Sequence, residues 1–203
     1  MNLILADDHA LFRDTLSFLL DQKTDHHILA SVETMADLRQ AVSEQEADLE
    51  CILLDYNMPE GDTLAEATYL KRKYPQLKLA FLTGTQSGIT LKHIESSGVD
   101  GILHKEDAVE SIVDALNCIS QGQKVVSQSI QEKIANDAFD LTNREFHILC
   151  LIIKGKTSAQ IGEALNLSPR TVEKHKQNIM HKMQCSNTSQ LIATAHRLNI
   201  EAH

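Results

Sequence analysis

The sequence has few features of a disulfide-bonded, metal-rich or membrane-spanning protein. No apolar run approaches the roughly 18 residues that a transmembrane helix needs. The chain starts Met1-Asn2-Leu3, without the basic residues and apolar core of a signal peptide. Its four cysteines are far apart and have no metal-ligand spacing: Cys51, Cys118, Cys150 and Cys185. These absences predict a cytoplasmic protein with reduced thiols and no membrane partner.

Charge is unevenly divided along the 203 residues. From Asp140 onward there are eight Lys and Arg residues against five Asp and Glu residues, a net charge of +3, whereas the whole chain carries −9. A mildly basic segment attached to an acidic one suggests that nucleic acid binds at the C-terminal end. The alternative is that these charges only form a solvated surface.

Strand and helix patterns alternate up to about residue 120. Expected strands are 3–6, 28–32, 49–54, 77–82 and 101–103, and expected helices are 9–20, 35–42, 64–74, 89–96 and 109–119. Five strand-helix units predict an α/β fold: a five-stranded, doubly wound parallel sheet with helices on both faces. In such sheets the functional site lies at the C-terminal ends of the strands.

Beyond residue 120, the pattern changes to a linker and four compact helices. Residues 121–138 are polar and rich in Gln and Ser, with at most one helical turn around 130–134. The helices are expected at about 143–154, 158–166, 169–183 and 189–198, with N-caps at Thr142, Thr157, Ser168 and either Thr188 or Ser189. This all-α segment is predicted to be a second domain.

Acidic residues follow two of the expected strands. Asp7 and Asp8 end the first strand, and Asp55 ends the third. Thr83 and Lys105 end two others. Three carboxylates can hold Mg²⁺, and Asp55 could then attack phosphorus to form an acyl phosphate. Thr83 and Lys105 suit the phosphoryl oxygens, although each residue alone could be an N-cap, a turn or a loop residue.

This half of the chain resembles the receiver domain of two-component response regulators. The matching stretches are Asp7-Asp8, Leu53-Leu54-Asp55, Met58-Pro59, Leu82-Thr83-Gly84 and Lys105. The resemblance implies a flavodoxin-like fold in which Asp55 is the phosphoacceptor. It also implies that Asp8, Asp55 and the Asn57 carbonyl hold Mg²⁺, that Thr83 is the switch hydroxyl and that Lys105 binds phosphate. The family usually has an aromatic residue three positions before the lysine, where this chain has Ile102.

The segment 158–183 has a helix-turn-helix pattern, although a plain helical hairpin is the alternative. Base contacts in a DNA major groove are expected from the outer face of the second helix, through Glu173, Lys174 and Gln177. Phosphate contacts are expected from Lys156, Thr157, Ser168, Arg170, Thr171, Lys176 and Lys182. His175 is expected to be half-buried.

The C-terminal half resembles the DNA-binding domain of the LuxR, NarL and FixJ regulators. The matching stretches are 141–145, Gly155-Lys156-Thr157, Ile161-Gly162 and 167–175. Together the two resemblances imply a NarL/FixJ-type response regulator with a receiver at 1–120, a linker at 121–138 and a DNA-binding domain at 139–203. They imply that a sensor histidine kinase phosphorylates Asp55. They also imply that a homodimer binds double-stranded DNA, with 189–198 as a dimer contact.

Two other functions fit parts of the pattern. A regulator that does not depend on phosphorylation would leave the acidic pocket unused, but all five pocket residues are present. An aspartate-nucleophile phosphatase would also place an Asp after an apolar strand, but such enzymes need a second Asp two residues later, where this chain has Asn57. We therefore expect a transcription regulator and not an enzyme.

Overall fold

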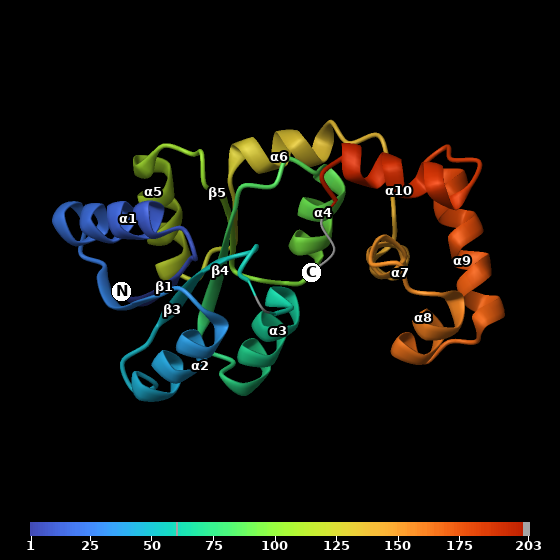
Figure 1. The fold of residues 1–203 in the computed structure, drawn as a ribbon. Helices are drawn as coiled ribbons and strands as arrows, with labels where there is room; N and C mark the ends of the chain where they lie inside the picture. The colour runs from blue at the N-terminus through green and yellow to red at the C-terminus, as the bar shows by residue number, and fades with distance from the viewer. Residues whose placement is uncertain (60, 201–203) are drawn as a thin grey trace. The chain divides into compact units, whose positions relative to one another are not determined.

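The computed structural model describes residues 1–59 and 61–200, so the last three residues of the expected DNA-binding domain lie outside the described residues. The chain forms two compact units (Figure 1). The first comprises Met1–Gly84 and Ser97–Gln131, and the second comprises Thr85–Ser96 and Glu132–His203. Among the described residues, no helix is long and apolar enough to cross a membrane.

The first unit is built on a parallel sheet. Its strands are β1 (Asn2–Ala6), β2 (His27–Val32), β3 (Cys51–Asp55), β4 (Lys78–Thr83), β5 (Gly101–His104) and β6 (Val125–Val126), in the order β2-β1-β3-β4-β5-β6. Within the described residues the sheet has six strands, so the expected count of five is wrong. The sixth, β6, pairs with β5 through Gly101↔Val125 and Ile102↔Val126. Two residues are too few to show the alternation that identifies a strand in a sequence.

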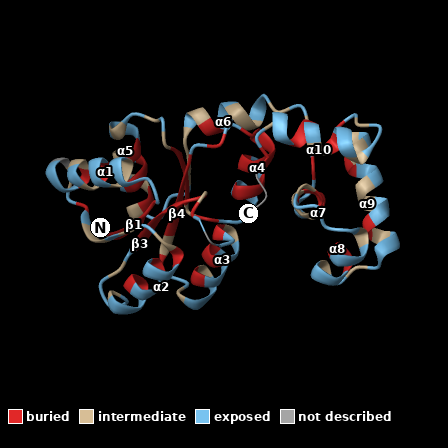
Figure 2. Ribbon diagram, viewed as in Figure 1, coloured by how far each residue is buried: buried red, intermediate tan, exposed pale blue. Residues whose placement is uncertain are grey.

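Helices cover both faces of this sheet. Helices α1 (Ala10–Lys23) and α5 (Val109–Ser120) lie on one face, and α2 (Met35–Glu44) and α3 (Thr63–Lys73) lie on the other (Figure 1). Alternate residues of each strand point to opposite faces, so Leu3 and Leu5 pack with α1 and α5. The buried residues follow the strands and the inner sides of these helices (Figure 2). The expectation of a doubly wound α/β fold is confirmed.

The expected linker contains more regular structure than its composition suggested. It includes β6 and also α6 (Gln128–Ala135), an eight-residue helix. Ile130 is fully buried, whereas most of its neighbours in α6 are exposed or half-buried. One buried apolar residue gives little periodic signal, which explains why the sequence predicted at most one turn here.

The second unit is helical. It contains α4 (Gly88–Ser96), α7 (Asn143–Ile153), α8 (Ser158–Leu165), α9 (Pro169–Lys182) and α10 (Thr188–Arg197). Ile89 of α4 belongs to the same apolar core as α7, and the His93 ring lies 4.3 Å from the Phe146 ring. Helix α4 therefore packs on α7, although the strand-helix alternation suggested that it would cover the sheet. An apolar helix face does not itself specify its partner.

Three of the four expected N-caps of α7–α10 are confirmed. Thr142 and Thr157 form capping boxes with Glu145 and Gln160, and Ser168 accepts a hydrogen bond from the Thr171 N–H at 3.1 Å. Helix α10 is capped by Asn187, one or two residues before the expected Thr188 or Ser189. Asn187 Oδ1 accepts from the Gln190 N–H at 2.9 Å, because an Asn side chain reaches the free N–H groups of a first turn as well as a hydroxyl does.

The turn between α8 and α9 depends on a small residue. A Cβ atom on Gly162 would lie 2.6 Å from the Leu167 carbonyl oxygen, and the Leu167 N–H donates to the Gly162 carbonyl at 2.8 Å. The turn passes through Asn166, whose φ of 53° is left-handed, a conformation that Asn tolerates. This close approach leaves no room for a side chain at position 162.

His26, just before β2, makes the stability of the first unit pH-dependent. Its side chain is buried, and burial, together with the charge of the N-terminal amino group, lowers its pKa below the ordinary value of 6.5. The unfolded chain then binds a proton more readily, so stability is complete above pH 6.5 and is lost as the pH falls below it. The midpoint temperature of thermal unfolding should therefore decrease as the pH is lowered from neutral to about 5.

The change His26→Gln should flatten this pH profile, because a neutral side chain replaces the one that titrates. His27 is the matched control, since it is adjacent and exposed. The profile of His27→Gln should retain its slope. A His26→Gln protein whose midpoint still falls as steeply as the wild type would contradict this assignment.

Candidate functional site

The C-terminal edge of the sheet brings together the residues expected from the strand ends. Asp7 follows β1, Asp55 ends β3 and Lys105 follows β5. The Lys105 ammonium Nζ lies 2.8 Å from Asp7 Oδ2 and 2.8 Å from Asp55 Oδ2. On its other oxygen, Asp55 accepts a hydrogen bond from the Asn57 N–H at 3.0 Å. Asp55 is thus held between a cation and a backbone donor.

The environment of Asp55 is poorly hydrated. The residue is 1% exposed, and burial raises the pKa of its carboxyl, while the hydrogen bonds from Lys105 and Asn57 act in the opposite direction. Its carboxylate lines a cavity of about 290 Å³ together with His9, Phe12, Gly84 and Lys105, among others. A small anionic group can therefore reach Asp55 from the cavity.

Asp8 and His9 complete an acidic group at this edge. One ligand atom from each of Asp7, Asp8, His9 and Asp55 lies within 4.8 Å of the others. Asp7 is fully buried, and its Oδ2 accepts no hydrogen bond, although the Lys105 ammonium is close. A buried carboxylate oxygen of this kind, beside further carboxylates, fits a divalent cation with oxygen ligands.

Sequence reasoning missed two residues of this site. His9 Nδ1 lies 2.8 Å from Asp8 Oδ1, and the Lys105 ammonium lies 5.3 Å from the centre of the Phe12 ring. His9 directly follows the Asp7-Asp8 pair in the sequence, and Phe12 comes three residues after His9. The sequence could have indicated both residues, because the segment between β1 and α1 must pass the acidic edge. His9 is the N-cap of α1, and Phe12 lies in its first turn.

Thr83 is fully buried as the last residue of β4. Its carbonyl accepts a hydrogen bond from the Lys105 N–H at 2.9 Å, which joins the ends of β4 and β5. The next residue, Gly84, lines the cavity. Thr83 thus lies where the strand end meets the cavity, beside the lysine that binds Asp55.

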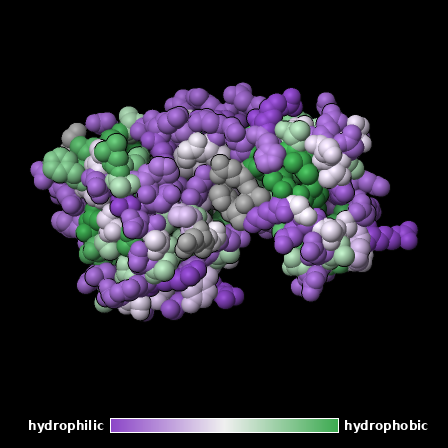
Figure 3. All heavy atoms as spheres, viewed as in Figure 1, coloured by the Kyte–Doolittle hydropathy of each residue, from purple (hydrophilic) through white to green (hydrophobic). Residues whose placement is uncertain are grey.

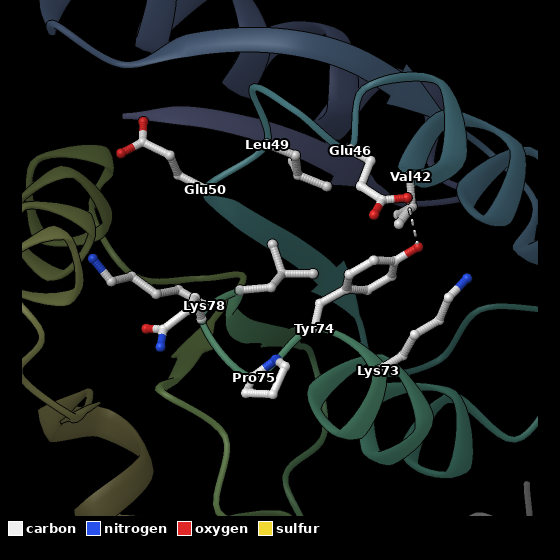
Figure 4. A pocket seen from close by; sticks show the side chains of 10 residues that line it. Val42, Glu46, Leu49, Glu50, Lys73, Tyr74, Pro75 and Lys78 are labelled. Atoms are coloured by element: carbon white, nitrogen blue, oxygen red, sulfur yellow. Dashed lines mark hydrogen bonds between the residues drawn. The ribbon is translucent and has the colours of Figure 1, made fainter.

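A second cavity, of about 430 Å³, lies at the opposite edge of the sheet, near the starts of β3 and β4 (Figure 4). Tyr74 forms part of its wall, and its hydroxyl donates to Glu46 at 3.2 Å. Lys78 donates to the Ser120 carbonyl at 2.6 Å. These polar groups are already engaged within the chain. We therefore take the acidic group at the C-terminal edge of the sheet, and not this cavity, as the candidate functional site.

In the second unit, α9 presents the residues expected to contact bases. Glu173, Lys174 and Gln177 are all exposed, and their spacing places them on one side of the helix. Glu173 accepts a hydrogen bond from the Ser158 hydroxyl at the start of α8. His175 is half-buried, as expected. Because Glu173 is engaged by Ser158, Lys174 and Gln177 remain as the expected base contacts.

The residues expected to contact phosphates surround the starts of α8 and α9. Lys156, Ser168 and Arg170 are exposed, and Thr171 is half-buried. Thr157 and Ser168 are N-caps, so their hydroxyls already accept hydrogen bonds from their own helices. Free N–H groups at a helix start attract anions, which makes these two helix starts suitable for phosphate oxygens.

Lys176 and Lys182 differ from the other expected phosphate contacts. Lys176 is half-buried in the middle of α9. Lys182 donates to the buried carboxylate of Glu145 at 2.7 Å. Burial alone would raise the pKa of Glu145, but the hydrogen bonds from Lys182 and Thr142 lower it overall. Lys182 therefore also stabilises the helical unit.

Helix α10 has a largely internal apolar face. Leu191 and Ala195 are fully buried in the core of the helical unit. Ile192 and Leu198 are only partly buried. Hydrophobic side chains are visible over α7 and α10 in Figure 3. A contact between two copies through α10 would have to use the partly buried residues.

Comparison with known proteins agrees with this geometry. Residues 3–117 match the response regulator receiver domain, and residues 140–195 match the bacterial regulatory proteins of the luxR family. The chain belongs to the response regulator family. It combines a receiver domain with a LuxR-type helix-turn-helix domain, and it is a DNA-binding transcription regulator.

Several relatives of this response regulator cover nearly its whole length. The oxygen regulatory protein NreC of Staphylococcus epidermidis is 28% identical over 212 residues, 96% of each chain. NreC of Staphylococcus aureus is 28% identical over 211 residues, also 96% of each chain. The solved structure of RcsB from Salmonella enterica serovar Typhimurium, bound to promoter rprA in the presence of BeF3⁻, has a TM-score of 0.75 at 25% identity, covering 98% of this chain and 99% of that one.

Proposed function

We propose that this response regulator is phosphorylated on Asp55 by a sensor histidine kinase. The observation that carries the proposal is the Asp55 carboxylate, buried at the cavity and 2.8 Å from the Lys105 ammonium. An Asp55 oxygen attacks the phosphorus of a phosphohistidine. The O–P bond forms as the donor's P–N bond breaks, and the imidazole leaves with a proton. Lys105 pairs with the phosphoryl oxygens.

Mg²⁺ is the cofactor that this site fits best. Asp7, Asp8, Asp55 and Asn57 would hold it, since carboxylate and carbonyl oxygens are its preferred ligands and the carboxylates of Asp7, Asp8 and Asp55 lie together. When bound, the ion reduces the repulsion between the Asp55 carboxylate and an incoming phosphoryl group. Lys105 and the Asn57 N–H meanwhile hold Asp55 in position.

The surface of α1 supports a protein donor. Leu11 is 83% exposed and Phe18 is 65% exposed, and their spacing of two turns places them on one side of α1. Hydrophobic side chains are visible over α1 and α5 in Figure 3. Exposed apolar residues that lie together indicate a binding surface, and α1 also carries Phe12, which lines the cavity. We place the kinase on this side of α1.

The helical unit is proposed to read DNA through α9, as a homodimer. Lys174 and Gln177 would contact bases. Phosphates would be contacted by the starts of α8 and α9 and by four cationic side chains: Lys156, Arg170, Lys176 and Lys182. One recognition helix covers only a few base pairs, so useful specificity needs two copies on a two-fold-related site. Binding of one copy per site at saturation would contradict this arrangement.

Phosphorylation of Asp55 can be tested with acetyl phosphate and Mg²⁺. Intact-mass measurement should show one added phosphoryl group, which EDTA should block and Asp55→Ala should abolish. Asp62→Ala is a matched control, because Asp62 is an exposed helix cap nearby, and it should label normally. A phosphoryl group that persists in Asp55→Ala would refute the assignment. Continuous turnover of a small phosphoester would favour the phosphatase instead.

A further inference from the structure

The turn after β5 is closed by its own hydrogen bonds. The Asp107 N–H donates to the His104 carbonyl at 3.0 Å, and the His104 N–H donates to Asp107 Oδ2 at 3.0 Å. Lys105 lies within this turn, and its ammonium reaches Asp7 and Asp55. Residues 104–107 therefore move together, and a displacement of Lys105 displaces Asp107.

The other oxygen of Asp107 reaches the start of α6. The Ser129 hydroxyl donates to Asp107 Oδ1 at 2.7 Å, and the Ser129 and Ser127 hydroxyls lie 3.1 Å apart. Burial opposes ionisation of Asp107, but the hydrogen bonds from Ser129, Ser127 and the His104 N–H lower its pKa overall. A carboxylate at a helix start also interacts favourably with the helix dipole. Asp107 thus holds the first turn of α6.

Helix α6 has a separate attachment to the sheet. The Ser127 N–H donates to the Ile102 carbonyl of β5 at 3.0 Å, which fixes the residue before α6. The Ser127 backbone therefore does not follow a shift of the 104–107 turn, and the hydrogen bonds that join Asp107 to the Ser129 and Ser127 hydroxyls take up the difference. The boundary between the two compact units falls inside α6, between Gln131 and Glu132.

We propose that Asp107 is a positioning residue that couples the phosphorylation of Asp55 to helix α6. This coupling rests on the proposed phosphorylation of Asp55. A phosphoryl oxygen draws the Lys105 ammonium away from Asp7, the 104–107 turn shifts, and the Asp107–Ser129 hydrogen bond breaks. The first turn of α6, which leads from the receiver into the DNA-binding unit, is then less firmly held.

Hydrogen–deuterium exchange of the full chain, with and without beryllofluoride and Mg²⁺, tests the coupling. In the wild type, beryllofluoride should speed exchange in residues 128–132 about fivefold, the effect of losing one ordinary hydrogen bond. In Ser129→Ala and Asp107→Ala, exchange should be fast already, and beryllofluoride should change it little. Ser129→Thr keeps a hydroxyl and should keep the response.

Ser120→Ala is the matched control. The Ser120 hydroxyl also donates a hydrogen bond of 2.7 Å, but to the Asn117 carbonyl within α5, so this variant should respond as the wild type does. Bound beryllofluoride is measured separately by fluorine NMR. A wild type that binds none refutes the proposed function of Asp55. A wild type that binds it without a change in α6, or a Ser129→Ala protein that keeps the full change, overturns the coupling alone.

Discussion

Raising the salt concentration from about 50 to about 200 mM should weaken DNA binding roughly a hundredfold for each bound copy. This magnitude follows from four cationic phosphate contacts per copy, since each neutralised phosphate releases counterions: Lys156, Arg170, Lys176 and Lys182. Electrophoretic or fluorescence titrations of the full chain with beryllofluoride would measure the slope. When the logarithm of the binding constant is plotted against the logarithm of the salt concentration, a dimer should show about twice the slope of one copy.

Single substitutions should separate base contacts from phosphate contacts. Lys174→Ala should change the base preferences found by site selection, whereas Arg170→Ala should weaken all sequences alike and reduce the salt slope by about one. Arg197→Ala is the control, because Arg197 is exposed on α10 of the same unit. Unchanged preferences in Lys174→Ala would show that the wrong side of α9 had been assigned to DNA.

Lys182 cannot serve as a simple phosphate probe. Its removal leaves the buried Glu145 carboxylate without its cation, which costs about 1–2 kcal/mol of stability after allowance for the partial exposure of Lys182. Weaker DNA binding by Lys182→Ala would therefore mix two effects. Arg170 is exposed and has no such partner role assigned, so its variant gives the cleaner measurement.

The acidic edge was predictable because parallel strands fix where their C-terminal ends lie. Asp7, Asp55 and Lys105 each follow a short apolar run, so strand periodicity alone places them together. The caps Thr142 and Thr157 were predictable for a similar reason, since a capping box is a local pattern of four residues.

The remaining features depend on contacts between distant segments. Strand β6 is defined by its pairing with β5, and α4 by the apolar core that Ile89 joins. The Asp107–Ser129 hydrogen bond joins residues of two different turns. Neither residue belongs to a periodic pattern or to a motif, so only the folded chain shows that they meet.

Thr83→Ala should reduce the gain in DNA affinity that beryllofluoride produces by about tenfold, while leaving phosphorylation of Asp55 largely intact. The physical reason is that a hydrogen bond to a charged phosphoryl oxygen is worth more than an ordinary one. A two-state protein shifts only as far as the ligand stabilises one state over the other. Thr83 is buried at the end of β4 and adjoins Lys105, so its hydroxyl can supply that difference.

Ile102→Ala should lower the stability of the protein but leave the beryllofluoride gain in DNA affinity nearly unchanged. Ile102 is 2% exposed and pairs with Phe81 and Val126 in the sheet, so its truncation should cost about 2–5 kcal/mol of stability. It has neither a ring nor a hydroxyl, and its branched Cβ restricts rotation about χ1. Its side chain therefore has little freedom to change position on activation, and the beryllofluoride gain in DNA affinity should stay within about twofold of the wild type.

DNA titrations with and without beryllofluoride, on each variant, would decide between these residues. Thr83→Ser keeps the hydroxyl and should restore most of the gain, which separates the hydrogen bond from any packing effect at this position. The Ile102 carbonyl still accepts from the Ser127 N–H after truncation, so the start of α6 is retained in Ile102→Ala. If Ile102→Ala removes the gain and Thr83→Ala keeps it, the coupling passes through residue 102, and Thr83 and Lys105 do not carry it.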